Sequence, residues 1–124
     1  MIRKIRYTVD KELVRCSPEG AVNADSIADF VNDVCRDKEI GNEVIKVLFD
    51  TRRATFAGKP DDLKSVMKKF WEHYRKFEYI KVAVILQNPY ETAISIILKE
   101  KLKQMNNLTF GLFSTEAAAV KWLN

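Results

Sequence analysis

Two runs of mostly apolar residues, rich in valine and isoleucine, constrain the fold of this chain more than any other feature. They span residues 44–50 and 81–86, and each lacks the polar alternation of a strand with one exposed face. Strands that are apolar on both faces are typical of parallel sheets covered by helices. Segments with helical periodicity lie before, between and after the two runs, at residues 27–35, 63–77 and 90–105. This alternation predicts an α/β domain with a parallel sheet core.

Shorter strand patterns occupy both ends of the chain. Residues 5–9 alternate between apolar and polar side chains, and residues 13–16 resume a strand after a turn at Asp10-Lys11-Glu12. Two short strands with a tight connection predict a hairpin, which makes one strand antiparallel. Residues 108–113 form a last strand, and Ser114 or Thr115 then caps a final helix. The sequence therefore predicts one α/β domain over residues 1–124, with a mixed five-stranded sheet, the element order ββαβαβαβα and helices packed on the sheet.

The helix starts carry recognisable signals. Asn23 is expected to cap the first helix, with Val22 and Ile27 forming a hydrophobic staple around it. Asn88 is expected to cap the third, with Pro89 in the first helical position and Glu91 reaching back from the third. The helix over residues 63–77 is rich in aromatic residues, which we expect on its buried face. These are Phe70, Trp71, Tyr74 and Phe77.

Length and composition favour a protein that folds without stabilising metal ions or disulfides. A chain of 124 residues can bury one core without metals or disulfides. No apolar run approaches the roughly 18 residues of a membrane span, and residues 1–6 do not resemble a signal peptide. Cys16 and Cys35 have no CxxC or zinc spacing, so we expect reduced thiols. These features predict a cytoplasmic protein without a membrane span.

Residues for catalysis are scarce. His73 is the one histidine, and no phosphate-binding glycine loop or zinc-ligand spacing occurs. Asp61 and Asp62 are adjacent, but acidic residues in a first helical turn usually complement the helix dipole. We therefore expect no enzymatic activity, no cofactor and no metal.

Polar residues gather at the predicted carboxyl ends of the strands, where parallel sheets collect ligands. The candidate binding residues are Asp50, Thr51, Arg52, Arg53, Thr55, Asn88 and Tyr90. Asn23, Ser114 and Thr115 are expected on the same edge. The arginines and the helix N-termini suit a small anion. A simpler alternative is that Asp50 and one arginine form a loop ion pair while the other arginine is solvated.

Three segments together resemble the STAS-like superfamily, and within it the SpoIIAA-like group of small bacterial proteins. They are residues 47–56, residues 81–85 and the ending at residues 110–123. The resemblance implies a mixed sheet with packed helices and no assumed enzymatic activity. Anti-sigma-factor antagonists of that superfamily are switched by phosphorylation in an Asp-Ser-Ser-Gly motif. This chain has Ala57-Gly58-Lys59-Pro60 there, so the resemblance does not carry the phospho-acceptor over. Thr51 and Thr55 lie near that motif but not in it.

Two functional hypotheses lead, and a third, weaker one is an enzyme that uses Arg52 or Arg53 on a phosphate or carboxylate substrate. The first is a non-enzymatic interaction or regulatory module that binds a protein partner or a second copy of itself. Its contact surface would be the loop at residues 50–59 and the basic helix after it, since the net charge of +4 is concentrated in the middle of the chain. The second is a small-molecule or lipid carrier with an apolar pocket, as in the CRAL-TRIO lipid carriers of related fold. Nucleic-acid binding is not expected, because the aromatic residues are predicted to be buried.

Overall fold

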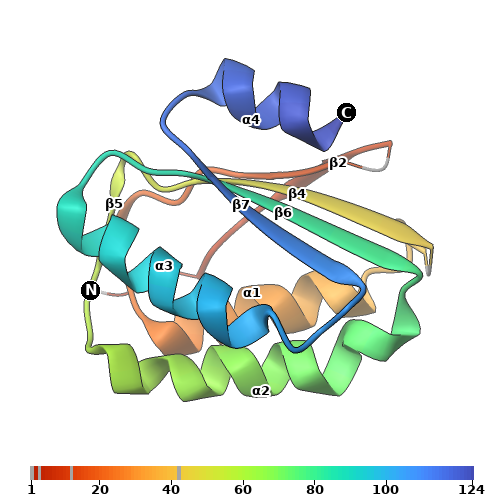
Figure 1. Ribbon diagram of the computed structural model, residues 1–124, viewed down its shortest axis with the longest axis horizontal. Helices are drawn as coiled ribbons and strands as arrows, with labels where there is room; N and C mark the ends of the chain where they lie inside the picture. The colour runs from red at the N-terminus through yellow and green to blue at the C-terminus, as the bar shows by residue number, and fades with distance from the viewer. Residues whose placement is uncertain (1, 3, 12, 42) are drawn as a thin grey trace.

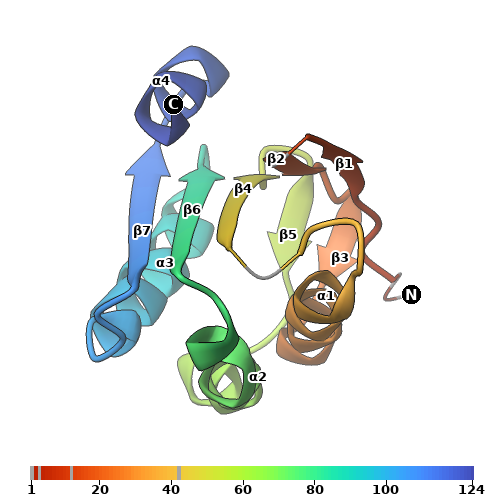
Figure 2. The ribbon, with the colours of Figure 1, turned by 90° about the vertical axis from the view of Figure 1, so that its right-hand side faces the viewer.

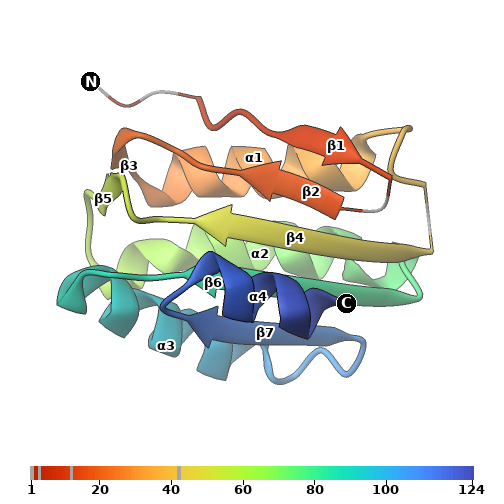
Figure 3. The same cartoon turned by 90° about the horizontal axis from the view of Figure 1, so that it is seen from above.

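The computed structural model describes residues 2, 4–11, 13–41 and 43–124, and its centre is a five-stranded sheet in the order β1-β2-β4-β6-β7 (Figure 3). The strands pair in parallel except for β1, which is antiparallel to β2. The predicted mixed five-stranded sheet is therefore confirmed. Glu12, in the predicted hairpin turn, lies outside the described residues. The strands are β1 Thr8–Asp10, β2 Leu13–Cys16, β4 Val44–Asp50, β6 Tyr79–Ile85 and β7 Leu108–Phe113.

Helices cover the sheet unequally. Three of them, α1 Ala24–Arg36, α2 Lys64–His73 and α3 Pro89–Leu102, lie on one face, and α4 Glu116–Leu123 lies on the other (Figure 1). The end-on view shows α4 standing apart from the other three helices across the sheet (Figure 2). Two separate apolar clusters result. Ile45, Val47 and Phe49 belong to the larger cluster, on the three-helix side, and Leu48 belongs to the smaller one under α4.

A second, two-stranded sheet was not predicted. It pairs β3 Gly20–Val22 with β5 Ala54–Phe56 in parallel, in the register Gly20↔Ala54 to Val22↔Phe56. The sequence pattern indicates turn and loop at residues 17–20 and 51–60 instead. Three-residue strands are too short to show a period in the sequence, and their partners are 34 positions apart, so no local pattern announces the pairing.

The helix caps confirm one prediction and correct another. Asn23 is the N-cap of α1, and its Oδ1 accepts from the Ser26 backbone N–H at 2.8 Å. Asn88 and Pro89 occupy the predicted positions at the start of α3, but the Asn88 side chain makes no capping bond. Glu91 does not reach back to the cap; it is buried, and its carboxylate accepts from the Phe56 backbone N–H.

The aromatic segment is not a single buried stripe. Its α-helical part ends at His73, between the 3₁₀ turns Pro60–Leu63 and Tyr74–Lys76. Phe70 and Phe77 are buried as predicted, and Tyr74 is half-buried. The prediction for Trp71 was wrong, since it is 53% exposed. One position along a helix is a rotation of about 100°, which turns Trp71 away from the face that Phe70 presents to the core. None of the described helices is both long and apolar enough to cross a membrane.

Gly111 on β7 provides a test of how α4 is fixed to the sheet. The rings of Phe113 and Trp122 lie 5.3 Å apart and cover this glycine. A Cβ at Gly111 would lie 2.8 Å from Phe113 Cε2 and 3.1 Å from Trp122 Cζ2. We expect Gly111→Ala to lower the free energy of unfolding by about 1–3 kcal/mol through overpacking, measured by urea denaturation.

The control is the same substitution in a Phe113→Leu background, where the shorter side chain makes room for the new methyl group. Gly111→Ala should then cost clearly less than in the parent protein. An equal cost in both backgrounds would contradict the overpacking explanation.

Candidate functional site

The loop after β4 carries most of the residues predicted to bind a ligand, and its charges are already paired. Arg52 donates from Nε to Asp50 Oδ1 at 3.0 Å and from Nη2 to Asp50 Oδ2 at 2.7 Å. The Arg52 side-chain hydrogen bonds hold the pKa of Asp50 below its ordinary value of 3.8, against the opposing effect of partial burial. Arg53 Nη1 contacts Glu19 Oε1 at 3.2 Å. The simpler alternative expected an ion pair between Asp50 and one arginine, and Arg52 forms it. The other arginine, Arg53, pairs with Glu19 and is not merely solvated.

The remaining predicted residues do not converge on one point. Thr55 is exposed on β5, and Tyr90 is exposed, with its hydroxyl donating to the Gly58 carbonyl. Asn88 accepts from Thr92 Oγ1 through its backbone oxygen at 2.8 Å. Thr51 lines a cavity described below, and its Oγ1 donates to the Ile85 carbonyl at 2.7 Å. Anion binding by this loop stays a prediction.

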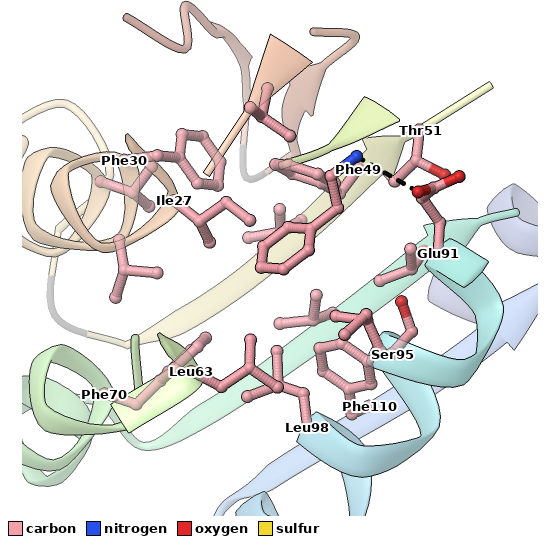
Figure 4. A pocket seen from close by; sticks show the side chains of 18 of the residues that line it. Ile27, Phe30, Phe49, Thr51, Leu63, Phe70, Glu91, Ser95, Leu98 and Phe110 are labelled. Atoms are coloured by element: carbon pink, nitrogen blue, oxygen red, sulfur yellow. Dashed lines mark hydrogen bonds between the residues drawn. The ribbon is translucent and has the colours of Figure 1, made fainter. Parts of the chain in front are cut away.

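An apolar cavity lies between the sheet and the three helices α1, α2 and α3 (Figure 4). Its volume is about 110 Å³. Protein interiors are normally packed without spaces larger than a water molecule, so this volume is unusual for a core. Its walls are hydrocarbon and aromatic side chains, the Cys35 thiol and three polar residues. The polar residues are Thr51, Glu91 and Ser95.

These three polar residues lie at one end of the cavity, but the surface that faces the cavity is almost entirely hydrocarbon. In Figure 4, Thr51 and Glu91 lie together where β4 ends, with Ser95 one turn further along α3, while Phe30 and Phe70 lie toward the opposite end. Glu91 is only 9% exposed, and its Oε2 accepts from the Phe56 N–H at 3.2 Å. Ser95 is half-buried. No lysine, arginine or histidine is among the residues that line the cavity.

Sequence reasoning missed Glu91 and Ser95, although a signal was present. Both fall in register with the apolar stripe of α3, since Glu91, Ile94, Ser95 and Leu98 follow the spacing i, i+3, i+4 and i+7 that shares one helix face. Polar residues in such a register face the core. The cap assignment for Glu91 rested on the capping-box spacing, in which the third helical residue reaches back to the N-cap.

The other reactive groups are poorly placed for chemistry. Burial raises the pKa of the Cys35 thiol to about 11, with Lys76 opposing the shift, and burial raises that of Cys16 to about 12. Both thiols therefore stay protonated at neutral pH and are weak nucleophiles. His73 Nε2 lies 3.0 Å from Asn32 Oδ1, and its pKa is lowered, mainly by burial. Among the described residues, no three His, Cys, Asp or Glu side chains cluster as metal ligands do.

Comparison with known proteins places the fold. An uncharacterized protein of the DUF3478 family with a SpoIIAA-like fold, from Shewanella loihica PV-4, is similar to this chain with a TM-score of 0.60 and 14% identity, over 97% of this chain and 92% of that one. The anti-sigma factor antagonist SpoIIAA in its unphosphorylated form matches with a TM-score of 0.49 and 12% identity, over 96% of both chains. No family model matches the sequence, and no curated protein matches it. The chain is an α/β module of SpoIIAA-like fold, as the sequence resemblance indicated.

The Asp50–Arg52 pair predicts a pH dependence of stability. Because the folded-state pKa of Asp50 is below its ordinary value, its stabilising effect is complete above pH 3.8 and is lost as pH falls through the folded pKa. We expect Arg52→Ala to return the pKa of Asp50 toward 3.8, as measured by NMR titration of its carboxyl carbon.

In urea denaturation, the stability difference between the parent protein and Asp50→Asn should be constant from about pH 6 to 7 and should shrink in acid. Asp61→Asn, at an exposed carboxylate on the 3₁₀ turn before α2, is the control. An Asp50 pKa that does not respond to removal of the Arg52 side chain would contradict the assignment.

Proposed function

We propose that this protein is a non-enzymatic binding module that holds a small, mostly apolar ligand in the cavity between its sheet and the helices α1, α2 and α3. The observation that supports this most directly is the cavity itself, about 110 Å³ in volume, with walls that are almost entirely apolar. Small-molecule sites in proteins commonly combine an apolar lining with a few placed polar groups. Of the two hypotheses from the sequence, this is the carrier.

The size of the cavity sets the affinity to expect. A ligand of about six to eight heavy atoms that buries about 200 Å² of apolar surface gains about 5 kcal/mol. Before the entropic cost of association is subtracted, that free energy corresponds to a dissociation constant of about 0.2 mM, which is the tightest binding to expect from apolar burial alone.

The absence of enzymatic activity is part of the proposal. Nucleophilic catalysis needs a nucleophile next to a base. Cys35, which lines the cavity, is a buried thiol with a raised pKa, and His73 is hydrogen-bonded to Asn32 and is not among the lining residues. These placements favour binding over turnover.

A second function, protein binding, is favoured by one observation, the exposure of Trp71. Its ring lies 5.4 Å from that of Tyr74, and Arg75 lies over the Tyr74 ring at 5.6 Å. We define the basic α2 surface as the exposed residues Lys64, Lys68, Trp71, Arg75 and Lys76. An exposed aromatic ring among positive charges suits an acidic protein partner. It is the helical part of the surface that the interaction hypothesis used, without the loop at residues 50–59 and with Trp71 on its exterior.

The apolar-ligand proposal predicts that filling the cavity abolishes binding. Toluene titrated into ¹⁵N-labelled protein should shift amide signals of cavity-lining residues such as Val47 and Ile94. Val82→Phe places a ring in the cavity and should remove these shifts. Val120→Phe makes the same change under α4, outside the cavity, and should keep them.

A native mass spectrum of gently purified protein, beside a denatured spectrum, would show whether the protein carries a non-covalent ligand from its cell.

In the toluene experiment, Val84→Leu is a smaller cavity-filling change that replaces Val82→Phe if Val82→Phe does not fold. Toluene-induced shifts that survive all cavity-filling variants, or no response of the parent protein to toluene, would overturn the proposal.

The basic α2 surface makes a separate prediction. In a crosslinked pull-down from cell extract, Trp71→Gln should lose captured acidic proteins, because the substitution removes the exposed ring without changing charge. Ile96→Gln, which removes an exposed apolar side chain on α3, is the matched control and should retain them. Equal capture by both variants would count against this surface.

A further inference from the structure

The exposed faces of α1 and α2 carry opposite charges. On α1, Asp25 and Asp29 are exposed and lie one helical turn apart, and on α2, Lys64 and Lys68 have the same spacing and are also exposed. Within the residues that the structure describes, none of these four side chains belongs to an ion pair. Charges of both signs on two neighbouring helices are therefore available to a partner.

Two contacts between the helices show how these charges are aligned. His73 Nε2 lies 3.0 Å from Asn32 Oδ1, and Lys76 Nζ, in the turn after α2, donates to the Cys35 carbonyl at 2.6 Å. Both contacts join residues 41 positions apart, and they advance along both helices in the same direction. The two helices therefore run parallel, and Figure 2 shows them side by side on the same side of the sheet.

The same offset sets the level of each charge along the helix axes. Asp25 lies level with Val66, midway between Lys64 and Lys68. Asp29 lies two residues beyond the level of Lys68. Because a helix rises 1.5 Å per residue, each aspartate lies within about 3 Å of a lysine along the axis. The acidic and basic faces are therefore matched in level as well as in spacing.

From this match we propose that the two faces bind a second copy of this chain, in a symmetric dimer whose two-fold axis runs parallel to α1 and α2 and between them. Rotation about such an axis keeps every residue at its own level and sets α1 of each copy against α2 of the other. The Asp25 and Asp29 carboxylates then face Lys64 and Lys68 of the second copy, and the same contacts form twice. This inference rests on the protein-binding function of the basic α2 surface and names its partner, and it does not depend on the cavity.

A second copy suits these faces better than another acidic protein does. A uniformly acidic partner that covered both helices would satisfy the lysines and bring like charge against Asp25 and Asp29. A second copy satisfies both faces at once. It also covers Trp71, which is 53% exposed on the same surface, and aromatic side chains of this kind are enriched at protein interfaces. Exposed ion pairs contribute little individually and are screened by salt, so we expect a weak dimer that dissociates as salt rises.

The experiment is sedimentation equilibrium of the full chain at low salt. The parent chain should form a reversible dimer that weakens between about 0.05 M and about 0.5 M sodium chloride. Lys68→Glu and Asp29→Lys should each raise the dissociation constant at least about tenfold, because like charges then meet at the interface. Lys121→Glu makes the same change in charge as Lys68→Glu but lies exposed on α4, across the sheet, and should leave the dimer intact.

Mixing the two weakened variants makes the test specific. An equal mixture of Lys68→Glu and Asp29→Lys should form a mixed dimer, identified by its mass in a native spectrum, because opposite charges again face each other in both halves of the interface. An unrelated acidic site would not restore pairing in this way.

The outcomes separate this inference from the function on which it rests. A parent chain that stays monomeric at about 1 mM and low salt would overturn the dimer. A dimer that both charge reversals leave unchanged, or variants that do not pair when mixed, would overturn the assignment to α1 and α2. Capture of acidic proteins that depends on Trp71, by a chain that stays monomeric, would leave protein binding standing and overturn only the identity of the partner.

Discussion

The pairing of β4 with β6 is the constraint on which the rest of this structure depends. The two strands run parallel over seven residue pairs, from Val44↔Tyr79 to Asp50↔Ile85. Both are apolar on both faces, so the sheet is stable only when each face is covered. Connections between parallel strands cross over the sheet, and these crossovers supply α2 and α3. The opposite face depends on α4 alone, where Lys81 donates to the Trp122 carbonyl at 2.8 Å.

The cavity follows from covering one face with three helices. α1 and α2 pack against each other, whereas α3 packs over β7 and β5. Helices are rods of about 10 Å diameter, and three rods on a twisted sheet leave space where they diverge unless large side chains fill it. Here phenylalanines approach from several sides, yet about 110 Å³ stays open. Because a space of this size costs stability, its retention in an otherwise closely packed core favours a role in binding.

The sequence predicted the features that depend on local pattern. Apolar runs gave β4 and β6, helical periodicity gave α1 and α3, and Asn23 and Thr115 marked two helix starts. The short strands β3 and β5 depend on a pairing between distant segments, which leaves no periodic trace. Trp71 was misplaced because helical spacing identifies an apolar stripe but does not show where its buried part ends. The candidate site was predicted least well, since the loop at residues 50–55 has the expected polar residues but uses them in its own ion pair and backbone contacts.

Glu91 shows why the site had to be found in three dimensions. In the sequence, Glu91 follows Asn88-Pro89-Tyr90. An acidic residue in the first turn of a helix is already explained by its favourable interaction with the helix dipole. In the fold, β5 comes within hydrogen-bonding distance of α3, and the Phe56 N–H offers the carboxylate a partner inside the protein. The Phe56 N–H belongs to β5, the short strand that pairs with β3. Glu91 is therefore held beside a part of the fold that leaves no periodic signal in the sequence.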